Sequence, residues 1–210
     1  MCYNKESSIS VFIYSIVLSV YLWKRNYPND RFMAFISTTV AGIQLVEFLL
    51  WSNLNCNRIN HYSTIASHIL IMLQPLCIFA CSYYYDNTTI PQDILLGLLV
   101  ISAISLIYTT YKILKYNKNY CTKLAKNGHL NWNGTYGWSR LQRLSYFLPM
   151  TAFLFMKDKV YGRSIFSLIA ISLFMTMTKL GYNSKWESLW CLVGNSLPLY
   201  SIILGKIRYS

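Results

Sequence analysis

The chain has few acidic residues and little charge of either sign. Only seven of its 210 residues are Asp or Glu, against nineteen Lys or Arg, and charged residues make up 12% of the sequence. Soluble domains carry about twice that share of charge. This shortage excludes an ordinary soluble domain and an acidic disordered chain. Six cysteines in a chain of this length are also too few for a small disulfide scaffold.

Motifs of familiar catalytic chemistry are missing as well. The sequence holds no G-x-G-x-x-G, Walker, G-x-S-x-G or H-E-x-x-H motif and no Cys-x-x-Cys pair. Those motifs position nucleotide, acyl-transfer or zinc chemistry. We therefore expect no cofactor, no metal site and no catalytic residues, and we favour a protein that is not an enzyme. A membrane-embedded enzyme stays a third possibility.

The sequence is instead rich in long apolar runs, and 54% of its residues are hydrophobic. A helix needs about 20 mostly apolar residues to cross the hydrocarbon core of a bilayer. The runs are apolar around the whole helix circumference, which is typical of lipid-facing helices. We predict an all-α, polytopic transmembrane helical bundle, a single integral membrane domain with seven spans at 7–23, 32–52, 62–85, 94–114, 138–156, 160–178 and 186–205.

The fifth run is the weakest of the seven. Its clean apolar part covers 144–156, so it reaches spanning length only if Arg140 and Arg143 extend to the membrane interface. Six spans are the alternative, with the fifth segment re-entrant. A soluble loop at 115–139 is expected between the fourth and fifth spans.

The orientation of the bundle stays open on charge alone. We call the side that holds the N-terminus side A and the opposite side, side B. Side A receives eleven basic residues and side B eight, which favours a cytoplasmic side A. The first hairpin argues the reverse, with Lys24, Arg25 and Arg31 on side B against Lys5 on side A. The lipid bilayer is the predicted partner of these flanking charges, and no nucleic acid is expected.

Two further features depend on sidedness. N-glycosylation sequons begin at Asn87 on side B and Asn133 on side A, so at most one is used. Cys56 and Cys121 both fall in side-A loops and pair only if side A faces an oxidising compartment. The oligomeric state is not predicted.

Glu47 is the most informative residue, because it is the one carboxylate deep inside a predicted span. Gln44, Glu47 and Trp51 follow i, i+3, i+7 spacing and share one helix face. His68 lies at a similar depth in the next span, so antiparallel helices can bring it near Glu47. Such a pair can hold a proton, bind a cation or small molecule, or orient a water. The alternative is a structural hydrogen-bond clamp.

Three other polar residues complete the candidate binding site. Gln74 precedes Pro75 in the third span and can satisfy a backbone group on a neighbouring helix. Glu187 stands at the side-A rim of the seventh span. Asn195 lies within that span and is expected to hydrogen-bond across helices.

The aromatic segment 129–138 is the notable part of the loop. Aromatic residues flank Asn133-Gly134, a turn-forming pair, and predict a hairpin on side A. It either rests on the membrane surface, covers the site or recruits a partner. Recruitment is the basis of the alternative function, a structural or interaction protein.

Short segments resemble a known group of proteins. The segment from Gly42 to Trp51 (GIQLVEFLLW), the segment Leu73-Gln-Pro-Leu76 and the segment Leu189-Trp-Cys191 are similar to uncharacterised multi-spanning membrane proteins of large DNA viruses, including the mimivirus group. The resemblance implies a viral or host cell membrane as the location, and it implies no particular activity. The residues themselves favour a small binding or transport module.

Overall fold

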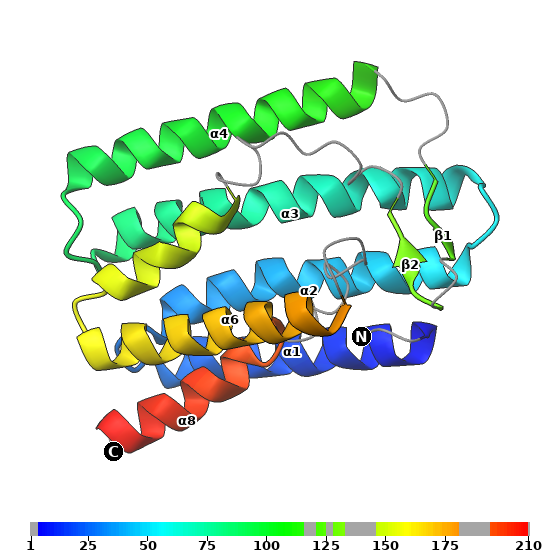
Figure 1. The fold of residues 1–210 in the computed structure, drawn as a ribbon. Helices are drawn as coiled ribbons and strands as arrows, with labels where there is room; N and C mark the ends of the chain where they lie inside the picture. Colours follow the sequence, from blue (N-terminus) through cyan, green and yellow to red (C-terminus); the bar gives the residue numbers. More distant parts are fainter. Residues whose placement is uncertain (1–3, 116–120, 125–127, 133–145, 181–193, 210) are drawn as a thin grey trace.

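The computed structural model describes residues 4–115, 121–124, 128–132, 146–180 and 194–209. Four long helices form an up-and-down array in chain order: α1 (Lys5–Arg25), α2 (Asp30–Ser52), α3 (Arg58–Tyr85) and α4 (Gln92–Lys115). Each of them packs against the one before it (Figure 1). The all-α prediction is therefore confirmed.

Asparagine and aspartate cap these helices, at their starts and at their ends. The Asn4 side chain accepts a hydrogen bond from the Ser7 amide at 2.8 Å, and Asn57 caps the amide of Asn60 at 2.9 Å. Asn26 and Asp86, which follow α1 and α3, adopt the left-handed conformation. Asn and Asp are the residues that best supply both kinds of cap, so the Asn-rich turns explain the helix boundaries.

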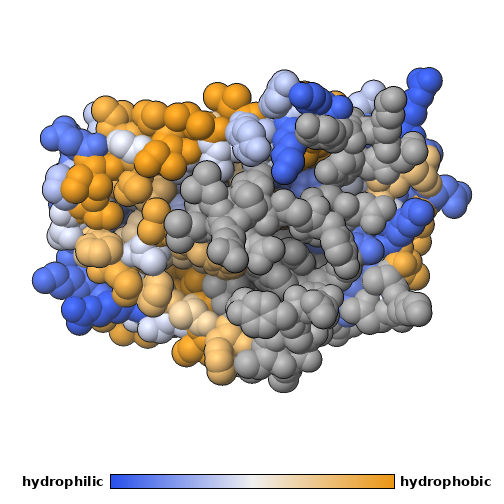
Figure 2. Space-filling view, turned by 45° about the horizontal axis from the view of Figure 1, so that its top comes forward, coloured by the Kyte–Doolittle hydropathy of each residue, from blue (hydrophilic) through white to orange (hydrophobic). Residues whose placement is uncertain are grey.

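All four of these helices are long and apolar enough to cross a membrane. Much of their apolar surface faces outward: Val17 of α1 is 60% exposed and Ile107 of α4 is 68% exposed. Figure 2 shows apolar residues over much of the left half of this face and hydrophilic residues at its left and right ends. This arrangement is compatible with a membrane protein, because lipid tails solvate such a band.

The fifth predicted span differs from the expected α-helix in its helix type and its length. Its described part forms a 3₁₀ helix, η1 (Leu148–Phe155), in place of an α-helix. Pro149 at its start lacks a backbone donor, which disfavours regular α-helical bonding. Eight residues at about 2 Å each extend about 16 Å, roughly half of a bilayer core. Seven spans therefore stay a prediction.

The last two predicted spans correspond to α6 (Lys159–Leu180) and α8 (Leu197–Tyr209). The seventh was expected to be one continuous helix to residue 205. Instead, Gly194 is helical, Asn195 and Ser196 form a turn, and α8 then begins and continues to Tyr209. Pro198 cannot donate a backbone hydrogen bond to the preceding turn, which fits a break at this point.

A buried ion pair joins the side-B end of the bundle. Arg25 at the end of α1 contacts Asp30 of α2 through two hydrogen bonds of 2.7 and 2.8 Å. The same guanidinium donates to the carbonyl of Ile202 in α8 at 2.8 Å. One cation therefore ties three helices together.

The end of η1 is fixed to the α3–α4 turn on the same side. Thr88 and Met156 form an isolated β-bridge, and Lys157 pairs with Asp86 at 2.6 Å. Asp158 accepts hydrogen bonds from Arg208 and Tyr209 at the end of α8. Burial opposes the charged carboxylate, but these bonds and the Arg208 charge outweigh burial and lower the pKa of Asp158.

Two short strands occupy part of the loop at side A. Strands β1 (Lys123–Leu124) and β2 (Leu130–Asn131) pair antiparallel, with Leu124 opposite Leu130. Gly128, in the turn between them, has a φ of 77°, a conformation that favours glycine. The predicted hairpin at Asn133-Gly134 lies outside the described residues. Trp132 is buried at 2% exposure, so the expected placement of its side chain on the membrane surface is wrong, while the lid and partner-recruiting alternatives stay predictions.

Candidate functional site

The contact between α2 and α3 positions the predicted site. A Cβ atom added at Gly42 would lie 3.6 Å from the Leu70 side chain, and the side-chain nitrogen of Asn60 donates a hydrogen bond of 2.7 Å to the carbonyl oxygen of Asn53. The two helices are antiparallel, so each step along α2 from Gly42 matches a step back along α3 from Leu70. Gln44 therefore lies at the same height along the bundle as His68. Glu47 then lies about one turn closer to side A.

These three polar side chains lie inside the protein. Gln44 and Glu47 are 0% exposed and His68 is 2% exposed. Each of them takes part in an interaction within the protein. A buried carboxylate, amide and imidazole within about one helical turn combine hydrogen-bond acceptors, hydrogen-bond donors and two titratable groups. The arrangement is chemically suited to a proton or a cation. Direct contact between Glu47 and His68 stays a prediction.

Two other predicted residues, Trp51 and Gln74, lie one turn or more along α2 and α3 from those three side chains. Trp51 of α2 is half-buried, and its indole N–H has no hydrogen-bond partner among the described residues. The Gln74 side chain accepts a hydrogen bond from the Tyr146 hydroxyl at 3.0 Å, six residues along α3 from His68. That separation is about 9 Å along the helix. Gln74 therefore fixes the segment before η1 to α3.

The two residues predicted on the seventh span have different outcomes. Asn195 lies in the turn before α8 and is 2% exposed, and its side-chain oxygen accepts a hydrogen bond from Ser15 of α1 at 2.7 Å. Asn195 therefore bonds to another helix as predicted, but from a turn and not from within a helix. Glu187 lies outside the described residues, as do Asn133 and its sequon.

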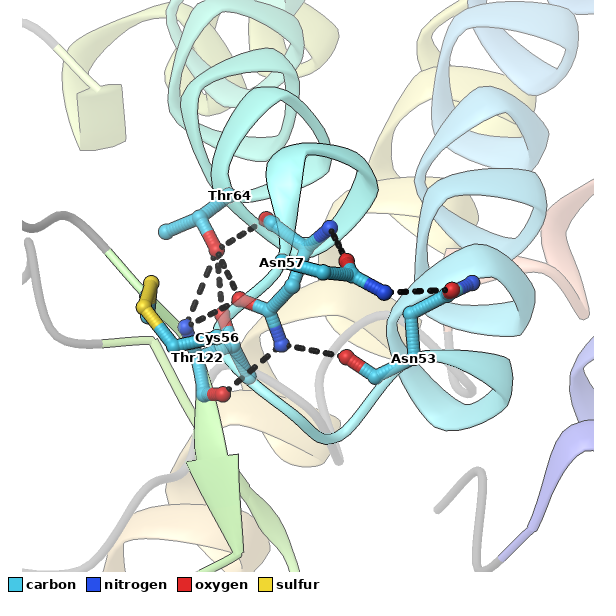
Figure 3. Close-up of a disulfide and its surroundings, with 7 residues drawn as sticks. Asn53, Cys56, Asn57, Thr64 and Thr122 are labelled. Carbon is cyan, nitrogen blue, oxygen red and sulfur yellow. Dashed lines mark hydrogen bonds between the residues drawn. A yellow bond between two sulfur atoms is a disulfide. The ribbon is translucent and has the colours of Figure 1, made fainter.

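A disulfide at side A is the feature that the sequence left undecided. Cys56 in the α2–α3 turn is bonded to Cys121, which follows α4, with their Cα atoms 5.5 Å apart. Figure 3 shows this bond beside a cluster of asparagine and threonine side chains. The location of both cysteines in side-A loops was the available sequence signal.

Hydrogen bonds beside the disulfide fasten the same segment to α3. The Asn60 side chain accepts from the Thr122 amide at 2.8 Å and donates to the Thr122 carbonyl at 3.0 Å. The hydroxyls of Thr64 and Thr122 are 2.8 Å apart (Figure 3). All three residues are 0% exposed. Nothing in the pattern of the sequence pointed to this cluster.

The cluster continues toward the candidate site along α3. Asn60, Thr64 and His68 are spaced four residues apart, so they follow one face of the helix. His68 therefore lies one turn below Thr64, toward the middle of the bundle. The side-A half of the α2–α3 contact is rich in buried polar groups, and the disulfide lies at its outer end.

Among the described residues, no group of three or more His, Cys, Asp and Glu side chains is placed to hold a metal ion. No family model, curated protein or solved structure matches this chain.

Proposed function

We propose that the chain is a multi-pass membrane protein that binds or conducts a proton or small cation through a site around Glu47. The observation that carries this proposal is the complete burial of Glu47 in a helix apolar enough to span a membrane. A charged carboxylate at such a position costs several kcal/mol unless it is protonated or paired. A proton or a small cation can meet this cost together with the contacts that Glu47 makes inside the protein, and a carboxylate can both take up and release either one.

Each neighbouring residue has a distinct part in this proposal. Glu47 holds the proton or cation. His68 and Gln44 shape the site, since both side chains are buried and both lie at nearly the same height along the bundle. Gln74 and Asn195 support it by joining neighbouring segments through Tyr146 and Ser15. We also propose a viral or host cell membrane as the location, as the resemblance of short segments implies.

The test is ion flux in liposomes that contain the purified protein. Proton flux is followed with a trapped pH dye, and sodium and potassium gradients are tested in turn. The Glu47→Gln variant keeps the shape of the side chain but cannot ionise, and we expect flux at the rate of protein-free liposomes. Glu6→Gln is the matched control, because the Glu6 side chain is 67% exposed.

A second readout separates a loss of function from a loss of folding. A protonated Glu47 gives an infrared carbonyl band that is absent in Glu47→Gln and present in Glu6→Gln. Thermal unfolding and gel filtration show whether each variant is folded, and His68→Gln serves if Glu47→Gln does not fold. Wild-type flux or ion binding in a folded Glu47→Gln protein would contradict the proposal and favour a structural role.

A further inference from the structure

The disulfide lies at one end of the bundle only. Cys56 belongs to the turn after α2, and Cys121 follows the end of α4. The N-terminus of α1 is at this same end, because α1 and α2 run in opposite directions (Figure 1). The other end holds the turns after α1 and α3 and the end of α8. Tyr209 shows this placement, since its ring lies 6.2 Å from the ring of Tyr27.

The Cys121 half of the disulfide is buried, while Cys56 is exposed in the α2–α3 turn. Cys121 is 2% exposed, and the adjacent Thr122 is 0% exposed. Both backbone hydrogen-bonding groups of Thr122 are satisfied by Asn60. The segment is thus positioned on the α2–α3 turn by hydrogen bonds as well as by the sulfur atoms. Disulfides persist in secretory, periplasmic or extracellular compartments and are rare in the cytosol.

We infer that side A of this protein faces an oxidising compartment, with the N-terminus outside the cytosol and the C-terminus inside it. Closing the bond removes two electrons and two protons from the thiols of Cys56 and Cys121. A disulfide-bearing oxidoreductase of that compartment accepts them and becomes a dithiol.

The charges of the first hairpin agree with this orientation. Lys24, Arg25 and Arg31 flank the turn between α1 and α2 on the cytosolic side, and Lys5 is the first residue of α1 on the other. The first helix usually dominates topology, and basic residues close to the spans count most. The larger basic total on side A comes mainly from residues between Lys112 and Arg143 and opposes this orientation, so the disulfide carries the inference.

The orientation also determines from which side of the membrane a proton or cation reaches Glu47. This conclusion rests on the proposed function. Glu47 is five residues from the end of α2 on side A and 17 residues from its start on side B. At 1.5 Å per residue these are about 8 Å and about 26 Å. The proton or cation therefore enters Glu47 from the oxidising side.

Protease protection in sealed microsomes tests the orientation. The full chain is translated with one epitope added before Met1 and another after Ser210, and proteinase K is applied outside. We expect the N-terminal epitope to survive and the C-terminal epitope to be removed. Removal of the N-terminal epitope with protection of the C-terminal one would overturn the inference. Detergent-opened microsomes, in which both epitopes are lost, are the control.

Mass tagging tests the disulfide itself. A variant that keeps only Cys56 and Cys121 is denatured and treated with a maleimide polymer. We expect no tag before reduction and two tags after it. A matched variant that keeps only Cys77 and Cys81, both free thiols of α3, takes two tags without reduction. Two tags on unreduced Cys56 and Cys121 would overturn the inference.

These measurements are independent of flux. If Glu47 proved to have no part in flux, the epitope pattern and the number of tags would both be unchanged. A reversed orientation would leave the effect of Glu47→Gln on flux intact, while changing the side from which the site fills.

Discussion

Asn60 holds both backbone hydrogen-bonding groups of Thr122. Its side-chain oxygen accepts from the Thr122 amide at 2.8 Å, and its side-chain nitrogen donates to the Thr122 carbonyl at 3.0 Å. The same nitrogen lies 2.7 Å from the carbonyl oxygen of Asn53 at the end of α2. One amide therefore joins two helices to the segment that follows a third.

Replacing this amide should weaken the whole side-A end. Asn60→Ala removes four side-chain hydrogen bonds, to Asn53, Thr64 and Thr122, and takes away the donor to the buried Thr122 carbonyl, while the Thr122 amide keeps its bond to the Thr64 hydroxyl. We expect the free energy of unfolding to fall by about 2–4 kcal/mol, measured by thermal or denaturant unfolding in detergent. Asn55→Ala, an exposed change in the same turn, should stay within about 0.5 kcal/mol of wild type. Equal stability of the two variants would contradict this reading.

The ion pair between Arg25 and Asp30 provides a second test. The Asp30 side chain is fully buried, and that of Arg25 is 9% exposed. Arg25→Met leaves a buried, uncompensated carboxylate and should cost about 3–5 kcal/mol of unfolding free energy. Asp30→Asn made in the Arg25→Met background should recover part of this loss. A double-mutant cycle with no coupling energy would show that the pair adds nothing beyond packing.

Two glycines make a matched pair for packing. A Cβ atom at Gly162 of α6 would lie 2.1 Å from the carbonyl oxygen of Phe153 and 2.8 Å from Met156, whereas one at Gly97 of α4 would meet nothing within 4 Å. Gly162→Ala should therefore destabilise the protein by about 1–3 kcal/mol. Gly97→Ala should leave stability unchanged or slightly raised, because alanine favours helix. Thermal unfolding of both variants checks the contrast, and a tolerated Gly162→Ala would refute the close packing of η1 against α6.

Much of the helical framework could be read from the sequence. The apolar runs at 32–52, 62–85 and 94–114 lie within α2, α3 and α4, because helix is the conformation that satisfies the backbone of such runs internally. The ends of these helices were less accurate. The structure begins α3 at Arg58, four residues before the apolar run, since Asn57 caps it there.

The segments near Pro149 and Asn195 were the least predictable. Hydropathy is similar whether such a segment forms an α-helix, a 3₁₀ helix or two pieces joined by a turn. The outcome depends on neighbours: the chain after η1 pairs with Thr88, and the turn before α8 bonds to Ser15. Contacts this distant in the chain leave no trace in local composition.

The sequence by itself determined the helical class, the apolar band and the presence of a carboxylate at Glu47, because these follow from composition and from local periodicity. Only the tertiary structure decided that Cys56 bonds Cys121 and that Asn60 fastens Thr122. It also decided that Gln44 and His68 lie at one level. Each of these depends on how helices far apart in the chain are aligned, and that alignment is fixed by packing between them.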